Sequence, residues 1–316
     1  MLKYSPGRTN WPSRPSLPRR IEWPTIILIL LCNIVWFWLA LAGAGLHPII
    51  WIGAMAVLTT LYWSLMHEAV HNHPTDIDWI NRLTVIIPIG WVFPYGRFRD
   101  SHLQHHETGE LTDPFDDPES FYLSPACWQN MARPIRLLLR FNNSLFGRML
   151  VGPAFAIWRM ILFDIARLAD KKTLQIERTS IVREWLLHVA LIGALALILA
   201  HYSPVPFWQL AIAAYLGISI LQIRTFPEHQ ASDQKGERTV IIEDNGPLAF
   251  LFLYNNLHVV HHTRPGLAWY RLPGFYRQHR EQFIMRNNGY VYASYWQVLR
   301  QYFLKAKEPV PHPGLQ

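Results

Sequence analysis

The sequence predicts an all-α membrane protein with two transmembrane hairpins, four spans in all, and a cytoplasmic helical cap. Hydrophobic residues make up 51% of the 316 residues and only 16% are charged, against about 25% charged in an average soluble protein. Neither Lys nor Arg occurs in residues 21–66 or 185–223, although the chain has 29 of them. Because basic residues are retained on the cytoplasmic side of a membrane, this segregation is typical of a polytopic protein.

Composition and charge also exclude several classes of protein. A chain with 14% aromatic residues and two cysteines is neither disordered nor a disulfide scaffold. The net charge of +7 would by itself suit nucleic acid or anionic lipid. A nucleic-acid binder has no reason to keep two long stretches free of basic residues. We therefore expect no nucleic-acid partner and a bilayer instead.

The first predicted hairpin covers residues 24–66. Residues 1–20 precede it, are rich in Pro and Arg, and are expected to form a flexible basic cytoplasmic tail. Pro24 opens an apolar stretch that ends at Ala42, and a second apolar stretch covers residues 48–66. Each is long enough to cross a hydrocarbon core of about 30 Å, and the short connection between them predicts a tight turn.

The second predicted hairpin covers residues 185–223. Its apolar arms, residues 185–201 and 207–223, are joined by a short segment with two prolines. Four spans with a basic N-terminus place both termini and the long 67–184 segment in the cytoplasm. We therefore expect a single membrane domain over residues 1–316, integral and multi-pass, in a bacterial inner membrane.

Two further apolar runs are too short for spans. Residues 83–94 include Pro88 and Gly90, and residues 150–163 include Arg159. At such lengths we expect an interfacial or re-entrant helix rather than a crossing.

Eight of the 15 histidines fall into three clusters. The first cluster has the spacing HxxxH and the other two have HxxHH. At this frequency of histidine, chance predicts roughly 0.03 HxxHH patterns, whereas two are present. Residues three and four apart share a helix face, so each cluster presents its imidazoles to one side. The members are His67 and His71, then His102, His105 and His106, then His258, His261 and His262.

Eight grouped imidazoles predict a site for two metal ions. Imidazole nitrogen suits iron, zinc, copper and nickel rather than magnesium or calcium. One zinc ion needs only three or four ligands, so a single ion would leave several histidines without a role. In the predicted topology all three clusters lie on the cytoplasmic side, where they can converge. The histidines expected to be ordinary polar residues are His47, His188, His201, His279 and His312.

The order HxxxH, HxxHH, HxxHH, divided by hairpins, resembles the integral-membrane fatty acid desaturase and hydroxylase superfamily. Four further stretches look like those of bacterial acyl-chain desaturases. They are Pro94-Tyr95-Gly96-Arg97, Asp113-Pro114, Asp116-Asp117-Pro118-Glu119-Ser120 and Asn255-Asn256-Leu257. The resemblance implies desaturation of a lipid or acyl chain by two histidine-bound, non-haem iron ions. It also implies molecular oxygen as co-substrate and an external electron donor, of the ferredoxin or cytochrome type.

Members of that superfamily commonly add a ninth histidine between the second hairpin and the third cluster. His229 is the matching candidate for a ninth metal ligand. Carboxylates near the ligands would orient the imidazole rings. The candidates for that role are Glu68, Asp100, Glu107, Asp113 and Glu228. Asn255 and Asn256 could approach a metal directly or through water.

Other interpretations stay open at this point. Membrane hydroxylases and ketolases of fatty acids or carotenoids use similar clusters, so hydroxylation is an alternative to desaturation.

The first cluster also reads HExxH, the zinc-protease motif, with Glu68 as general base. An intramembrane protease would leave both HxxHH clusters unused, which makes it the more remote alternative. A metal transporter would want ligands inside the spans, and residues 24–66 hold only His47, near a turn.

Overall fold

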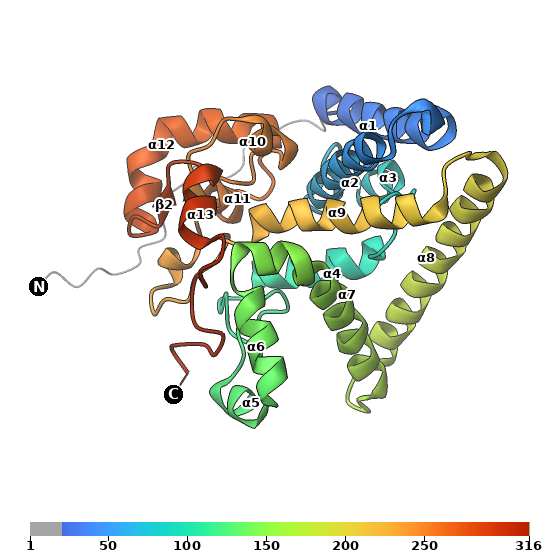
Figure 1. Cartoon of the computed structure of the whole chain (residues 1–316). Helices are drawn as coiled ribbons and strands as arrows, with labels where there is room; N and C mark the ends of the chain where they lie inside the picture. Colours follow the sequence, from blue (N-terminus) through green and yellow to red (C-terminus); the bar gives the residue numbers. More distant parts are fainter. Residues whose placement is uncertain (1–20, 316) are drawn as a thin grey trace, which may run out of the picture.

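The computed structural model describes residues 21–315 as a mostly helical molecule (Figure 1). The tail predicted over residues 1–20 lies outside the described residues. The elements are α1 (Trp23–Ala42), α2 (Pro48–Val70), α3 (Asp78–Thr84), α4 (Tyr95–Glu107), α5 (Pro125–Asn130), α6 (Arg133–Asn142), α7 (Leu145–Ala169), α8 (Gln175–Tyr202), α9 (Phe207–Thr225), β1 (Ile241–Ile242), α10 (Pro247–Leu251), α11 (His258–Thr263), α12 (Leu272–Arg286), β2 (Val291–Tyr292) and α13 (Tyr295–Tyr302). The strands β1 and β2 pair in parallel over two residues each, a small departure from the all-α prediction.

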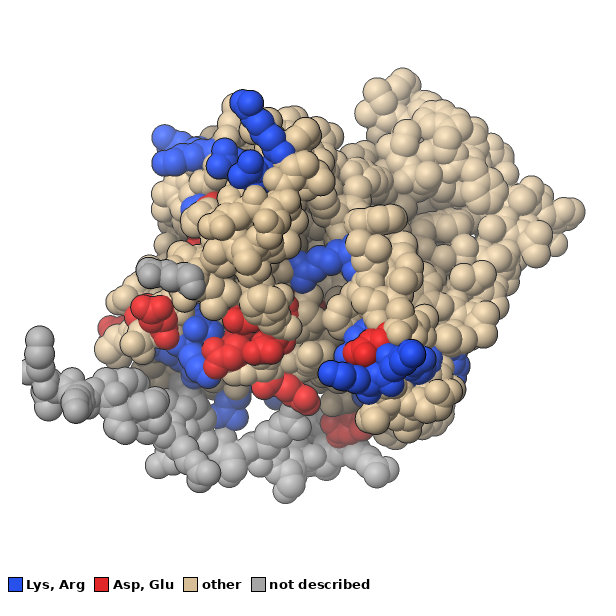
Figure 2. All heavy atoms as spheres, turned by 90° about the horizontal axis from the view of Figure 1, so that it is seen from below, with Lys and Arg blue, Asp and Glu red and all other residues tan. Residues whose placement is uncertain are grey.

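Within residues 21–315, five helices are long and apolar enough to cross a membrane, judged by length and composition. Four of them are the arms of the predicted hairpins, α1 with α2 and α8 with α9, and the fifth is α7. Seen from below, one broad part of the surface carries no charged side chain, while Lys, Arg, Asp and Glu gather on the rest (Figure 2). This division of the surface agrees with a multi-pass membrane protein.

The apolar run at residues 150–163 belongs to a longer helix than the sequence predicts. It is the middle of α7, which has 25 residues and contains Pro153 without ending there. The helix begins behind Ser144, whose hydroxyl accepts a hydrogen bond from the backbone N–H of Gly147 at 3.1 Å. Less apolar turns continue the helix at both ends of the apolar run, and a hydropathy pattern does not detect them as part of the helix. For the same reason α8 begins at Gln175, ahead of its predicted start.

The interfacial or re-entrant helix predicted over residues 83–94 is wrong. Helix α3 ends at Thr84, and the residues that follow form turns. Pro88 lacks a backbone donor and disfavours a helix. The segment instead packs on α2, where the hydroxyl of Tyr62 donates to the carbonyl of Val85 at 2.9 Å.

The helices α2 and α9 lie side by side and form the centre of the molecule (Figure 1). The hydroxyl of Thr60 donates to the carbonyl of Gly217 at 2.9 Å. The approach is close because a Cβ atom at Gly217 would lie 2.8 Å from the side chain of Thr59. The two hairpins also meet at their tips, where the hydroxyl of Ser203 donates to the carbonyl of Ala40 at 2.5 Å. Both tips therefore lie at one end of the molecule, and the histidine clusters lie at the other.

Candidate metal centre

Nine histidines from four parts of the chain converge at the far end of α2 and α9. One pair stands at the end of α2, three histidines lie on α4, one follows α9, and three lie on α11. Helix α4 begins behind Pro94, and α11 begins with the first histidine of its own cluster. The nine are the residues that the sequence predicts, namely His67, His71, His102, His105, His106, His229, His258, His261 and His262.

The nine imidazoles form two sets, which we call the five-histidine set and the four-histidine set. Within each set the potential ligand atoms all lie within 4.8 Å of one another. The five-histidine set consists of His67, His71, His102, His106 and His261, and the four-histidine set consists of His105, His229, His258 and His262. Each set is large enough to hold one metal ion, so the arrangement fits two ions.

The HxxHH spacing explains how α4 and α11 each serve both sets. Successive helix residues turn by about 100°, so positions i and i+4 differ by about 40°, whereas i+3 points about 60° to the other side. The outer two histidines of α4 accordingly enter the five-histidine set, and His105 enters the other. In α11 the assignment is reversed, because His261 alone joins the five-histidine set. Each of these helices therefore stands between the two sets.

The Nε2 atoms of neighbouring rings lie at a spacing typical of ligands on one ion. In the five-histidine set, His71 and His102 are 3.0 Å apart, His102 and His106 are 3.1 Å apart, and His106 and His261 are 3.1 Å apart. In the four-histidine set the distance is 3.1 Å for His105–His229, His229–His258 and His258–His262. Two nitrogens bound at about 2.1 Å to one ion and at right angles would be about 3.0 Å apart.

Three rings of the four-histidine set have their Nδ1 atoms bonded to groups that can only accept. The pairs are His105 with the carboxylate of Asp117 (2.8 Å), His229 with the carbonyl of Arg238 (3.2 Å) and His258 with Oδ1 of Asn255 (3.0 Å). A neutral imidazole with its proton on Nδ1 presents a lone pair at Nε2. The Nε2 atoms that face one another then carry lone pairs on both sides, and these repel unless a cation lies between them.

One proton cannot replace that cation. Burial lowers the pKa of His105, but the carboxylates of Glu119 and Asp117 outweigh burial and raise it to about 9, so His105 can donate to His229. Burial and the neighbouring His105 lower the pKa of His229 to about 3, and burial holds that of His258 well below its usual value. The pair of His229 and His258 stays without a proton between them. The donor set therefore fits a metal ion bound by neutral imidazole.

Two carboxylates that the sequence did not single out as ring-orienting groups lie against the histidines. Asp117 accepts from His105 at 2.8 Å, and Glu119 pairs with His102 at 2.9 Å. Asp117 is itself fixed by the backbone N–H of Thr112 at 2.8 Å. Metal-bound imidazole usually donates its other ring N–H to such a group. Both residues belong to the acidic stretch that the sequence shows after the second cluster. The sequence could not show that this stretch folds back onto α4, because that contact is tertiary.

Of the five carboxylates that the sequence suggested for this role, two lie beside the rings. Oε1 of Glu228 is 3.5 Å from Nδ1 of His258, and Oε1 of Glu68 is 3.8 Å from Nδ1 of His67. The other three face elsewhere. Asp100 pairs with Arg97, Asp113 accepts from the backbone N–H of Phe115, and Glu107 is exposed.

The two asparagines have different surroundings. Asn255 stands between the two sets, because its Oδ1 bonds to His258 and its Nδ2 lies 3.5 Å from Nε2 of His67. Asn256 points away from the histidines and donates to the carbonyl of Ile242 in β1 at 2.6 Å. Asn255 can therefore couple the two sets, and Asn256 supports the backbone below them.

His229 lies on no helix and is held by a short antiparallel pairing. The backbone N–H of Val240 donates to the carbonyl of Glu228 at 3.0 Å, and that of Gln230 donates to the carbonyl of Arg238 at 3.1 Å. These bonds enclose His229 on both sides and explain how a histidine outside the three clusters reaches the four-histidine set.

The histidines expected to be ordinary polar residues lie outside both sets. His47 accepts from the backbone N–H of Ile49 at the start of α2, and His188 bonds to the carbonyl of Trp91. His312 bonds to Thr112, and the rings of His201 and His279 lie against those of Tyr202 and Phe275.

The HExxH interpretation does not describe the site. His67 and His71 share their set with three histidines from α4 and α11, and Glu68 accepts from the backbone N–H of Trp269 at 3.3 Å.

Comparison with known proteins agrees with this arrangement. Residues 46–296, which include all nine histidines, match the family model described as fatty acid desaturase. The chain is also similar to the sn-1 oleoyl-lipid 12-desaturase of Arthrospira platensis, with 22% identity over 279 residues. That alignment covers 79% of this chain and 73% of the relative.

Proposed function

This chain belongs to the fatty acid desaturase family and is an oxidoreductase, and from that premise we propose that it is an oxygen-dependent fatty acyl (lipid) desaturase. In this proposal two non-haem iron ions occupy the two histidine sets, molecular oxygen is the co-substrate, and electrons come from a separate ferredoxin-type or cytochrome-type protein. The substrate is an acyl chain of a membrane lipid, as the name of the relative suggests.

The observation that carries the proposal is the pair of histidine sets with facing Nε2 atoms. Imidazole binds iron well, and nine imidazoles in two sets of five and four provide for two ions. When bound, the two irons would supply the oxidising power that removal of hydrogen from an unactivated methylene requires. The neutral imidazole ligands add no negative charge to the site.

The residues of this chain position the ligands. Asp117 and Glu119 hold the rings of His105 and His102 through Nδ1, which keeps the Nε2 lone pairs directed inward. Asn255 links a ring of one set with a ring of the other, so it would keep the two ions at a fixed separation.

For the topology we propose four crossings, with both termini, the helical cap and the histidine sets on the cytoplasmic side of a bacterial inner membrane. Helix α7 would then lie along the membrane surface. Its polar contacts with the site-bearing segments support this: Asp164 pairs with Arg97 of α4 at 2.6 Å, and Arg159 donates to the carbonyls of Ser120 and Pro118. A helix crossing the bilayer would take those groups away from α4 and its following loop. Reporter fusions test this topology, because cytoplasmic signals are expected near residues 120 and 300 and the opposite signal near 45 and 204.

Hydroxylation or ketone formation on fatty acids or carotenoids is the second candidate function, since the same ligands would serve. The deciding experiment expresses the chain with an electron donor, feeds deuterated saturated fatty acids, and analyses the lipids by mass spectrometry. Oxygen-dependent loss of two deuterium atoms from adjacent carbons supports desaturation. Gain of one oxygen atom from the gas supports hydroxylation, and altered carotenoids beside unchanged acyl chains would rule out the proposed substrate.

A further inference from the structure

Helix α6 has two contrasting faces, and both are open to the surroundings. Arg133, Arg136 and Arg140 follow one another at spacings of three and four and therefore share one face. Ile135 and Leu138 lie on the opposite side and are 49% and 44% exposed. Exposed large apolar side chains on a helix with a basic face are the signature of a helix at a membrane surface.

The three arginines of α6 carry positive charge that no ion pair balances within residues 21–315, where the pairs of other arginines are numerous. No Asp or Glu occurs between Glu119 and Asp164 in the sequence. Arg140 contacts the ring of Trp128, 5.4 Å from its centre, which leaves its charge available. A partner for this face must therefore supply negative charge.

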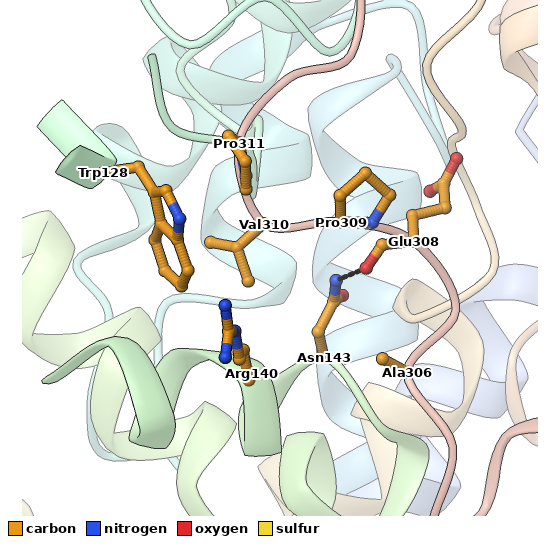
Figure 3. A pocket seen from close by; sticks show the side chains of 8 residues that line it. All are labelled: Trp128, Arg140, Asn143, Ala306, Glu308, Pro309, Val310 and Pro311. Carbon is orange, nitrogen blue, oxygen red and sulfur yellow. Dashed lines mark hydrogen bonds between the residues drawn. The ribbon is translucent and has the colours of Figure 1, made fainter. Parts of the chain in front are cut away.

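The C-terminal end of α6 is anchored, whereas its body stands free. Helix α6 packs on the start of α7, and Asn143, just after it, donates to the carbonyl of Glu308 (Figure 3). Figure 3 also shows Arg140 and Trp128 beside Val310, at the edge of a mainly apolar hollow. An amphiphile would find a guanidinium and apolar walls next to each other here.

We propose that α6 is an accessory membrane-binding element that rests on a leaflet rich in anionic phospholipid, with its arginines at the lipid phosphates. Charge complementarity calls for an anionic partner, and the exposed apolar face selects a bilayer over a soluble protein. Apolar side chains of an interfacial helix enter the acyl region while arginines reach the phosphates. An acidic electron carrier would bind the arginines but leave Ile135 and Leu138 in water. Because the spans already hold the chain at the bilayer, α6 would bind a leaflet without a separate step of recruitment from solution.

The test is hydrogen exchange of residues 131–142 in the full-length protein, reconstituted in nanodiscs. One disc holds phosphatidylcholine alone, and the other adds about one-third phosphatidylglycerol. We expect the amides to exchange at least about fivefold more slowly in the anionic disc, because each basic side chain at such a surface contributes on the order of that factor. The double variant R133Q/R136Q should lose this difference, and R271Q/R277Q, which removes equal charge from exposed positions near α12, should keep it.

Equal exchange rates of the unmodified protein in the two discs would overturn the proposal. So would a slowing that appears only after an acidic electron-donor protein is added, since α6 would then bind the carrier. A second readout guards against misfolding. Both double variants should retain the iron content and the lipid product of the unmodified protein, because α6 contributes no residue to either histidine set. A failed desaturase assay would leave the exchange comparison intact.

Discussion

The ammonium group of Lys307 donates a hydrogen bond to the backbone carbonyl of His229, 78 residues earlier in the chain. The side chain of Lys307 is only 6% exposed, and Glu308 lies 3.2 Å from its Nζ atom. Its backbone is held as well, since its N–H donates to the carbonyl of Asn143 at 3.0 Å. The C-terminal segment therefore supports the turn that carries His229.

Replacing Lys307 with methionine should weaken the four-histidine set. The change keeps the length of the side chain but leaves the His229 carbonyl without its charged donor, a loss of about 1.5–3 kcal/mol of stability. Because His229 is then less well positioned, we expect iron content to fall from about two ions per chain towards one. Colorimetric iron assay and resistance to a chelator measure this. Lys305→Met is the matched control at an exposed position, and an equal iron content in both variants would contradict the prediction.

Asp117→Asn should reduce metal binding without removing a ligand. The amide can turn its NH₂ group towards His105, which would move the ring proton to Nε2 and block the lone pair. Loss of such a ring-orienting partner typically costs 10–100-fold in metal affinity or activity. The neighbouring Asp116→Asn provides the control, because Asp116 is exposed and Asp117 is buried. Titration of iron into metal-free protein compares the two variants, and indistinguishable affinities would refute the role of Asp117.

Alanine at one ligand of each set should give different iron contents. His262→Ala leaves three imidazoles in the four-histidine set, whereas His102→Ala leaves four in the other. Both variants should lose turnover, because the proposed reaction uses both ions. His262→Ala should lose nearly one iron per chain, and His102→Ala should lose less. His201→Ala, at an exposed position of α8, should retain iron and turnover. Equal iron loss in all three variants would mean that the two sets have no special role.

Hydropathy was sufficient to identify the hairpins, and histidine spacing was sufficient to identify eight of the nine histidines that form the two sets. The arms of both hairpins are helices α1, α2, α8 and α9, because long apolar stretches bounded by proline have few alternatives. The signal for His229 was the weakest, since this residue lies on no helix and has no spacing partner. Only the family resemblance predicted it as a ligand. In the structure its Nε2 atom lies 3.1 Å from the Nε2 atoms of both His105 and His258.

What the sequence could not show depends on contacts between distant segments. Asp117 and Glu119 were visible as an acidic stretch, yet their bonds to α4 require the chain to turn back after Thr112, which has a φ of 74°. Hydropathy also predicted too short a helix at residues 150–163, because it measures apolar content and not the continuity of a helix such as α7. Lys307 had no local signal at all, since its partner is a backbone carbonyl far along the chain.

Gly217→Ala should destabilise the protein by forcing α2 and α9 apart. A Cβ atom there would lie 2.8 Å from the Thr59 side chain and 3.1 Å from the Ala56 carbonyl, and overpacking of this kind costs about 1–3 kcal/mol. Because α2 carries His67 and His71 at its far end, a shift of this helix should also lower iron retention. Gly193→Ala on α8 is the matched control, since nothing lies within 4 Å of the added atom. Thermal unfolding in detergent, followed by fluorescence, should show a Tm several degrees lower for Gly217→Ala and nearly unchanged for Gly193→Ala. The same Tm in both variants would mean that the two helices can separate without cost, and the close contact at Gly217 would then not support the site.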